Sequence, residues 1–549
     1  MNPLVAIPLL LLLVLLLAGA LALARRNRIY RLEIWLGPWL RRRREMGRCL
    51  PPVGAGRCRD LLFCFVDHFE PGTRDADPAR SDARFRAWTE GWPALAGRFA
   101  DSDGRRPQHS FFFPPHYYSD AYLRGLAAMD WLGVGETELH LHHENDTSAG
   151  LRATLAETLD LYARFGVLAC QGDPVTRRYA FIHGNWALDN SRPGFCGVND
   201  EISVLQETGC YADFTFPSLH RSQPRMVNAI YRAVDDPERP KSYDRGRVLR
   251  AGRPPSPGEF LLVTGPLALR LRRQPPFLAV EDADVTGGVP GTPERVRRWV
   301  RQGVHVAGRP EWIFVKVHTH GAPEEHRDAL LGRQAERMYS SLCEEYGDGV
   351  RWRLHFVTAR EMANIARAAE DGRFGDAGRY RDYWIPPYLA RHLRCTARYQ
   401  AAAFLPPAGP ASLPRLDLRL EPPGPGASLE LRGGLLRRVR GHLAALEISP
   451  APPGEGGGLV EAGGAAAASG PGGDGAAPGA AGRLVLTGSG EVELFLLDGS
   501  GLRGPQGPVA ARERIREGDS FLSRFVLRIE AGDPVHLEAL PPGRGGSAS

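Results

Sequence analysis

The stretch Glu138-Leu-His-Leu-His-His-Glu-Asn-Asp-Thr147 concentrates imidazole and carboxyl groups more densely than any other part of the chain. Glu138, His140 and His142 occupy alternating positions, so in a β-strand their side chains would point to one face. The polar residues that follow are typical of a strand end or a loop. Because neutral imidazole and carboxylate are natural ligands of zinc and similar ions, the pattern predicts a divalent-metal site where a strand ends in a cleft.

Length and composition limit the class of protein. A chain of 549 residues is long enough for two domains and an anchor, and 24% charged with 43% hydrophobic residues is typical of globular protein. The formal net charge is +6, but eight arginines follow the first hydrophobic segment, and the remainder carries about −2. These are Arg25, Arg26, Arg28, Arg31, Arg41, Arg42, Arg43 and Arg44. We therefore expect no nucleic-acid partner. The eight cysteines include no CxxC pair, which leaves a zinc ribbon or a disulfide framework without support.

The apolar segment Leu4 to Ala24 is long enough to cross a bilayer, which takes about 20 residues. Small residues at its end also resemble a signal-peptide cleavage site, but no positive charge precedes it, so we expect an uncleaved single-pass anchor in the cell membrane. Tyr30, Trp35 and Trp39 suit a membrane interface. The arginines after the segment place the large domain in the cytoplasm by the positive-inside rule, with a periplasmic or extracellular domain as the alternative.

Strand-like and helix-like patterns alternate through the middle of the chain. The expected strands are 60–67, 179–183, 260–264 and 312–318, and the expected helices are 122–129, 149–165 and 292–303. Such alternation predicts a parallel sheet, either doubly wound or closed into a β/α barrel. In both folds, ligands bind beyond the carboxyl ends of the strands.

The C-terminal part has a different composition. Residues 452–482 are almost entirely small or turn-forming and predict a disordered Gly/Ala/Pro linker. Short strand patterns on both sides, with Gly488-Ser-Gly490 as a turn, predict a small β-rich accessory domain. The expected segments are an anchor at 1–24, a basic segment at 25–57, the α/β domain at 58–372, a connector leading into the β-rich domain at 373–451, the linker, and the rest of the β-rich domain at 483–549.

Candidate functional residues stand where several of the expected strands end. Asp67 and His68 end the first strand, and His142 and Asp146 follow the strand of the opening motif. The remaining positions are His183-Gly-Asn185-Trp186 and His318-Thr-His320. Acid, imidazole and aromatic groups gathered at strand ends are what a metal-assisted hydrolase needs.

Residues 58–370 resemble the polysaccharide deacetylase family, which includes chitooligosaccharide and peptidoglycan deacetylases. Asp67-His68 stands where the family has an Asp-Asp pair, and Glu138-Leu-His-Leu-His142 resembles its second motif. Phe181 to Asp213 has the shape of the third motif, Val315-Lys-Val-His318 that of the late Leu-x-His motif, and His355 to Glu361 that of the closing strand and helix. The resemblance implies a distorted (β/α) barrel.

The resemblance also implies a metal site. The family binds its metal with one Asp and two His, and the corresponding positions here are His68, His142 and Asp146, with zinc as the expected ion. The exchanged positions of acid and imidazole keep the ligand count and the charge. His140 points to the same face as His142 and is a substitute ligand, and Glu144 could replace Asp146.

The activity that the resemblance implies is removal of an acetyl group, most readily an N-acetyl group, from a polysaccharide or glycoconjugate. Asp67 would act as general base, His318 would protonate the leaving amine, and His320 would orient it or share that role. His183, Asn185, Trp186 and Tyr211 are the expected substrate-binding residues. Such an enzyme would make or trim a surface exopolysaccharide near the membrane.

Two other functions remain open from the sequence. A glycosidase on the same barrel would use paired carboxylates and no metal. A non-catalytic protein of a polysaccharide export system would keep the barrel only to bind glycan.

Overall fold

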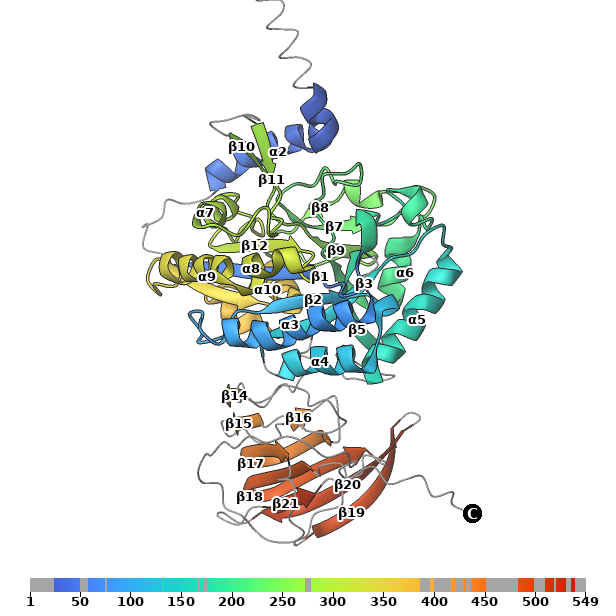
Figure 1. The fold of residues 1–549 in the computed structure, drawn as a ribbon, viewed down its shortest axis with the longest axis vertical. Coiled ribbons are helices and arrows are strands. Elements are labelled where there is room, and N and C mark those ends of the chain that lie inside the picture. The colour runs from blue at the N-terminus through green and yellow to red at the C-terminus, as the bar shows by residue number, and fades with distance from the viewer. Residues whose placement is uncertain are drawn as a thin grey trace, which may run out of the picture. The chain divides into compact units, whose positions relative to one another are not determined.

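The computed structural model describes residues 24–49, 58–74, 77–131, 133–164, 167–171, 176–271 and 278–385, together with β-strands between residues 395 and 538. The chain divides into two compact units, Met1–Tyr388 and Leu389–Ser549 (Figure 1). The candidate functional residues all belong to the first unit. The predicted anchor at 1–24 falls almost wholly outside the described residues.

A mixed sheet forms the centre of the first unit. Its strand order is β12-β1-β2-β3-β5-β6-β9-β7-β8, and every pairing up to β9 is parallel, whereas β7 runs antiparallel to both of its neighbours. Two further strands, β4 and β13, pair with β5 and β1. The strands are β1 (Arg59–His68), β2 (His109–Phe113), β3 (Gly135–Leu141), β4 (Ala169–Gln171), β5 (Thr176–His183), β6 (Cys210–Asp213), β7 (Ile230–Val234), β8 (Arg247–Val248), β9 (Glu259–Val263), β12 (Trp312–Thr319) and β13 (Trp352–Val357). The predicted parallel sheet is confirmed.

Helices flank this sheet (Figure 1). Two of them begin at side-chain caps. Asp77 accepts a hydrogen bond from the Arg80 backbone, and Thr292, where the sequence predicts a helix to start, accepts one from the Arg295 backbone. The helices are α3 (Pro78–Ala96), α4 (Asp120–Trp131), α5 (Ser148–Arg164), α6 (Glu201–Glu207), α7 (Pro293–Arg301), α8 (Arg327–Leu331) and α9 (Arg333–Tyr346). α4, α5 and α7 lie where the sequence predicts helices.

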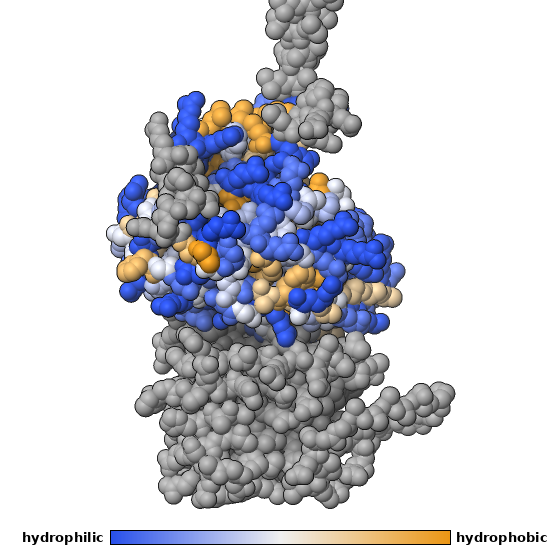
Figure 2. All heavy atoms as spheres, turned by 90° about the vertical axis from the view of Figure 1, so that its left-hand side faces the viewer, coloured by the Kyte–Doolittle hydropathy of each residue, from blue (hydrophilic) through white to orange (hydrophobic). Residues whose placement is uncertain are grey.

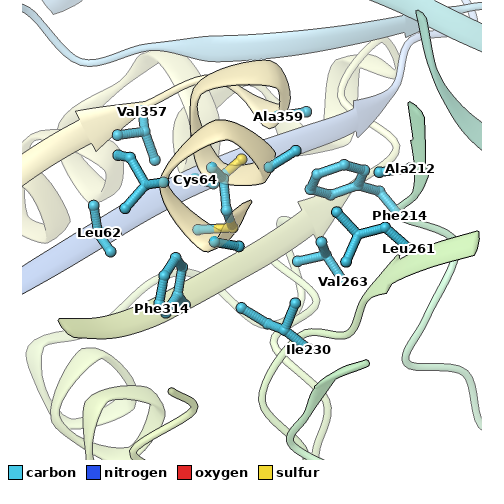
Figure 3. Packing of buried hydrophobic residues seen from close by; sticks show 14 of the residues in the cluster. Leu62, Cys64, Ala212, Phe214, Ile230, Leu261, Val263, Phe314, Val357 and Ala359 are labelled. Atoms are coloured by element: carbon cyan, nitrogen blue, oxygen red, sulfur yellow. The ribbon is translucent and has the colours of Figure 1, made fainter. Parts of the chain in front are cut away.

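One more helix, α10 (Ala359–Glu370), is buried along almost its whole length. It shares one hydrophobic core with inward-facing residues of the strands, including Leu62 of β1, Leu261 of β9 and Phe314 of β12 (Figure 3). In a regular β/α barrel, side chains from the strands alone fill the interior. Here the alanines of α10 let a helix backbone approach the strands closely, so the helix takes part in filling the core.

The polar groups of α10 are paired despite their burial. Arg360 lies 2.7 Å from Glu136 of β3, and Glu370 lies 2.7 Å from Arg232 of β7. At the start of the helix, Thr358 and Glu361 form a reciprocal capping box. Because an unpaired buried charge is strongly destabilising, these pairs fix the position of the helix relative to two separate strands.

Lys316 of β12 links distant parts of the sheet. Its side chain is 1% exposed, and its Nζ atom donates hydrogen bonds to the carbonyls of Phe214, at 2.7 Å, and Phe216, at 2.6 Å, just after β6. β12 and β6 are separated by several strands in the sheet order, so the sheet curls back toward itself in a barrel-like arrangement. Among the described residues no ladder joins β12 to β6 or β9.

Burial lowers the pKa of Lys316 from 10.5 to about 7. Between these two values the folded protein releases a proton that the unfolded chain still binds, so the free energy of unfolding rises with pH. We therefore expect the stability of the wild type relative to Lys316→Met to increase from pH 7 to pH 9, by about 1 kcal/mol or more. Urea unfolding at both pH values measures this, and a difference that does not change with pH would contradict it.

The basic segment after the predicted anchor forms α2 (Leu32–Cys49). Trp35 is fully buried and Trp39 is 4% exposed, and both pack in a cluster with Val227 and Leu267 of the first unit. The expectation that these tryptophans lie at a membrane interface is therefore wrong, because they cover an apolar patch of their own unit. One side of the first unit is mostly hydrophilic (Figure 2). A hydrophobic patch on this side lies toward the end of the unit that carries α2. Within the described part of the chain, no helix has the length and hydropathy needed to span a bilayer.

The first unit extends beyond the predicted boundary at residue 372. Ile385 is fully buried in the main core, and its backbone N–H and carbonyl both bond to the Asn364 side chain of α10. The stretch after α10 therefore belongs to the α/β unit rather than to a connector.

The second unit contains an eight-stranded antiparallel sheet with the order β14-β15-β17-β18-β20-β19, in which β16 and β21 pair with β17 and β18. Its strands are β14 (Cys395–Arg398), β15 (Leu416–Leu420), β16 (Ser428–Glu430), β17 (Leu436–Pro450), β18 (Gly482–Leu497), β19 (Val509–Glu517), β20 (Ser520–Ile529) and β21 (Val535–Glu538). Gly488–Gly490 does not form the expected turn, because β18 continues through it with an irregular register against β17. Most of the predicted linker, 452–481, lies outside the described residues.

Candidate metal centre

The carboxyl ends of several parallel strands bring a group of imidazoles and one carboxylate together. Glu70 follows β1, His140 lies near the end of β3, and His142 is the first residue after β3. His68 ends β1, and His320 follows β12. This is the edge of the sheet at which the sequence predicts the functional site.

Glu70, His140 and His142 direct their polar atoms to a common point. The Nε2 atom of His142 lies 2.9 Å from Glu70 Oε1 and 3.1 Å from His140 Nε2. The distance from His140 Nε2 to Glu70 Oε1 is 3.6 Å. Ligand atoms about 2.0–2.2 Å from a tetrahedral ion lie about 3.3–3.6 Å apart. The three atoms are therefore spaced much as they would be around one divalent ion, and we call them the Glu70 triad.

The outer nitrogens of the two imidazoles are also occupied. His140 Nδ1 lies 2.9 Å from the Ile182 carbonyl, to which only an N–H can donate, so its Nε2 atom carries a lone pair toward the triad. The Nδ1 atom of His142 lies 3.4 Å from the side-chain amide of Asn185. A metal-binding histidine typically donates a hydrogen bond from its second nitrogen, as His140 does here. His142 would do the same with the Asn185 amide turned so that its oxygen, rather than its nitrogen, faces Nδ1.

The charges of this region favour a bound cation. Burial alone would raise the pKa of Glu70, but hydrogen bonds with His140 and His142 outweigh it and hold the pKa below its ordinary value. Burial also lowers the pKa of His68 and that of His320, so both imidazoles are neutral at pH 7. A carboxylate together with imidazoles is the donor set that zinc and similar ions prefer.

A row of rings continues from the triad. His68 packs edge-on against His140 with ring centres 4.8 Å apart and stacks on His320 at 4.4 Å. Trp186 lies beside both, at 5.8 Å from His68 and 5.6 Å from His320. His142 keeps 30% of its side chain exposed, so the triad is open to solvent on that side.

A cavity of about 290 Å³ adjoins this row. Trp186, His318 and His320 form part of its wall, and the remaining lining residues are Arg74, Pro217, Ser218, Leu219, His220, Asp282, Asp284, Thr286 and His326. A tryptophan face beside acid and imidazole groups suits a polar ligand with an apolar ring face, such as a sugar.

Two aspartates that line this cavity have raised pKa values. Burial, with the nearby Asp282 carboxylate, raises the pKa of Asp284 to about 7. Burial together with Glu281 raises the pKa of Asp282 as well. One of the two can therefore hold a proton near neutral pH while the other is ionised, which is the condition for acid–base catalysis by paired carboxyl groups.

Only part of the predicted metal set comes together. His142 belongs to the triad, and His68 lies beside it. Asp146 does not reach it, because its Oδ2 atom lies 3.2 Å from the neighbouring His143 and its backbone N–H bonds to Cys196. The carboxylate is supplied by Glu70 instead, and His140, the substitute ligand of the prediction, takes the second imidazole position.

Asp67 is not open to the cavity. Its carboxylate is fully buried, with Oδ1 accepting a hydrogen bond from the Gly321 backbone at 2.6 Å and Oδ2 lying 3.0 Å from His109 Nε2. Such a carboxylate anchors the loop that carries His320, and its placement gives the general-base role no support. His318 and His320 do line the cavity, as expected for residues that transfer protons.

The predicted substrate-binding residues separate into two groups. Trp186 lines the cavity, and Asn185 contacts His142. The ring of His183 is fully buried and faces His143 and Glu201. Tyr211 is 2% exposed and donates a hydrogen bond to Glu138 at 2.5 Å in the core. A direct contact of His183 or Tyr211 with substrate does not fit these positions, because both side chains are closed off from the cavity.

Glu70 is the site residue that sequence reasoning missed. It stands two residues after His68, so a continued alternation beyond the end of β1 would have placed both on one side. His116, whose ring centre lies 5.6 Å from His142, carried no recognisable signal.

Comparisons with known proteins give little beyond this geometry. No protein-family model matches the chain, and a search of curated proteins gives no match. Among solved structures, a 4-alpha-glucanotransferase from Thermococcus litoralis is similar at 7% identity and a TM-score of 0.29, over 88% of this chain and 99% of the glucanotransferase. This similarity is too low to indicate a shared fold or activity.

The Asn185 contact allows a graded test of the triad. Asn185 has a φ of 55°, which glycine adopts without strain, so Asn185→Gly removes the amide and keeps the backbone. Loss of such a supporting contact typically weakens metal binding about 10–100-fold. We expect this loss in zinc competition titrations of the full chain. Asn190→Gly, at the same left-handed conformation, removes hydrogen bonds with Asn199 and Gly197 instead of the contact with His142, and is the control.

Unchanged zinc affinity in Asn185→Gly would show that Asn185 does not support His142. Equal weakening in both variants would show that the loop, rather than the amide contact, matters for binding.

Proposed function

We propose that this protein is a metal-dependent hydrolase that removes acetyl groups, N-acetyl groups first, from a polysaccharide or glycoconjugate. The observation that carries the proposal is the convergence of Glu70, His140 and His142 on one point, next to a row of rings that leads to a cavity. A resemblance in sequence motifs to polysaccharide deacetylases suggests the acetylated sugar as substrate. An N-terminal membrane anchor would keep the enzyme near lipid-linked or newly made glycans.

Glu70, His140 and His142 would hold the ion, and zinc fits the donor set best. A divalent ion at this point polarises a bound carbonyl group and increases the acidity of water. The chain supplies what such an ion needs: one carboxylate, two imidazoles, and the contacts of these rings with Ile182 and Asn185.

His320 is the residue best placed for proton transfer. It lies between the stacked His68 ring and the cavity, and its lowered pKa leaves it neutral and able to accept a proton at pH 7. His318 lines the same wall, and its Nδ1 atom is buried without a hydrogen-bond partner among the described residues.

Trp186 and the cavity would orient the substrate. The indole forms a wall that adjoins both His68 and His320, so a sugar ring packed against it would bring a substituent close to the triad. Arg74, on the same lining, can donate hydrogen bonds to sugar hydroxyls.

The proposal predicts zinc-dependent release of acetate from N-acetylglucosamine oligomers by the full chain. Glu70→Gln should abolish activity and lower zinc content, because it removes the only carboxylate of the triad. His320→Gln should lower kcat about 10²–10⁴-fold with a smaller change in KM. Glu144→Gln alters an exposed acid of the same sequence stretch and serves as the matched control.

Acetate release that survives Glu70→Gln and removal of zinc by a chelator would sink the proposal. A His320→Gln variant with wild-type kcat would move the proton-transfer role to another residue.

The pair Asp282 and Asp284 favours a second candidate, a glycosidase that uses the same cavity. Their raised pKa values suit a general acid with a carboxylate partner. This candidate predicts release of new reducing ends that persists in chelator and is abolished in Asp284→Asn. The deacetylase proposal predicts that the same variant still binds zinc.

A further inference from the structure

A second group of metal-binding side chains lies behind the Glu70 triad. His143, His183, Cys196 and Glu201 bring one ligand atom each within 4.8 Å of one another, and all four residues are buried. They come from the loop after β3, the end of β5, the following loop and the first turn of α6. None of them takes part in the hydrolase chemistry described above.

Neighbouring residues divide between the two groups. His142 directs its ring to the Glu70 triad, whereas the next residue, His143, directs its ring to Glu201. In the same way His183 faces this second group, while Asn185 and Trp186 face the triad and the cavity. The second group therefore fixes both chain segments that position the first.

The two imidazoles present their Nε2 atoms to one oxygen. His143 Nε2 lies 3.0 Å and His183 Nε2 lies 3.5 Å from Glu201 Oε1. The other carboxylate oxygen, Oε2, accepts a hydrogen bond from the Asp189 backbone at 2.5 Å and lies 3.5 Å from Cys196 Sγ. Glu201 thus has one oxygen tied to the protein backbone and one aimed at the imidazoles.

The tautomer of His183 leaves a gap in this arrangement. Its Nδ1 atom lies 2.5 Å from the Gly184 carbonyl, which can only accept, so Nδ1 carries the hydrogen and Nε2 carries a lone pair. That Nε2 atom is fully buried and has no hydrogen-bond partner among the described residues. It faces a carboxylate oxygen, which is also an acceptor. A cation between them would satisfy both atoms.

The remaining contacts match a metal-bound arrangement. His143 Nδ1 lies 3.2 Å from Asp146 Oδ2, which places a carboxylate beside the second nitrogen of this ring, as is common for metal-binding histidines. The backbone N–H of Val198 points to Cys196 Sγ at 3.4 Å and would stabilise a thiolate. With an ion bound, one thiolate and one carboxylate would balance its two positive charges in this buried place.

We propose that His143, His183, Cys196 and Glu201 form a second, structural zinc site that holds the loops carrying Asn185 and Trp186. The four protein ligands leave no position for substrate, which is typical of structural zinc sites and differs from the open Glu70 triad. The site would exist whether or not the triad is catalytic. It also gives Asp146 a role, that of orienting His143.

Cobalt substitution tests this site directly. A thiolate bound to Co²⁺ gives a charge-transfer absorption in the near ultraviolet, and Cys196 is the only thiol in either group. We expect the full chain loaded with Co²⁺ to show this band, and we expect Cys196→Ser to lose the band and the bound ion of this site. Cys210→Ser, which alters another buried thiol, is the matched control and should keep both.

Glu70→Gln separates the two proposals, because it should lose the ion of the triad and keep the charge-transfer band. Absence of the band in the wild-type chain at saturating Co²⁺ would overturn the second site. This outcome does not depend on whether any variant folds. A band that survives in Cys196→Ser would assign the thiolate to a different cysteine and would also overturn it.

Discussion

The metal centre depends on one constraint: the strands hold three electron-pair donors so close together, in a partly buried place, that the donors repel one another. Glu70 Oε1, His140 Nε2 and His142 Nε2 lie 2.9–3.6 Å apart, and at least one of these imidazole nitrogens carries a lone pair toward the others. Such atoms stay close only when a proton or a metal ion lies among them. The sheet holds these atoms close together, because β1 and β3 lie on either side of β2 and their carboxyl ends carry the three residues. The buried helix α10, the Lys316 link and the paired charges of Glu136 and Glu370 keep the sheet curled, and thereby hold the strand ends around the site.

Much of the fold follows from local sequence patterns. The apolar run at 60–67 and the capped helix after Thr292 form where periodicity and capping predict them, because burial of one face and satisfaction of backbone groups are local requirements. The burial of α10 inside the sheet was not predictable in this way. Its alanines are compatible with an ordinary surface helix, and only the distant partners Glu136 and Arg232 fix it in the interior. The position of the α2 tryptophans was also not predictable from local sequence, because tryptophan is favoured both on an apolar patch of a protein and at a membrane interface.

The site was predictable as a region but not as a set of ligands. The motif around His142 correctly marks the strand end, since alternation is a property of one strand. The choice between Glu70 and Asp146 depends on the course of the chain after each strand. The side chain of Glu70 contacts His142, whereas the side chain of Asp146 lies against His143. The division of His142 and His143 between two groups likewise depends on where α6 places Glu201.

The most direct test of the metal centre is anomalous diffraction at the zinc edge from crystals of the full chain grown with zinc. We expect an anomalous peak about 2.0–2.2 Å from Glu70 Oε1, His140 Nε2 and His142 Nε2, with an open coordination position facing solvent. A map with no peak there, and with His142 bonded directly to Glu70, would contradict a metal centre at this position. The hydrolytic function would then lose its basis, and the cavity would be better interpreted as a binding site for glycan.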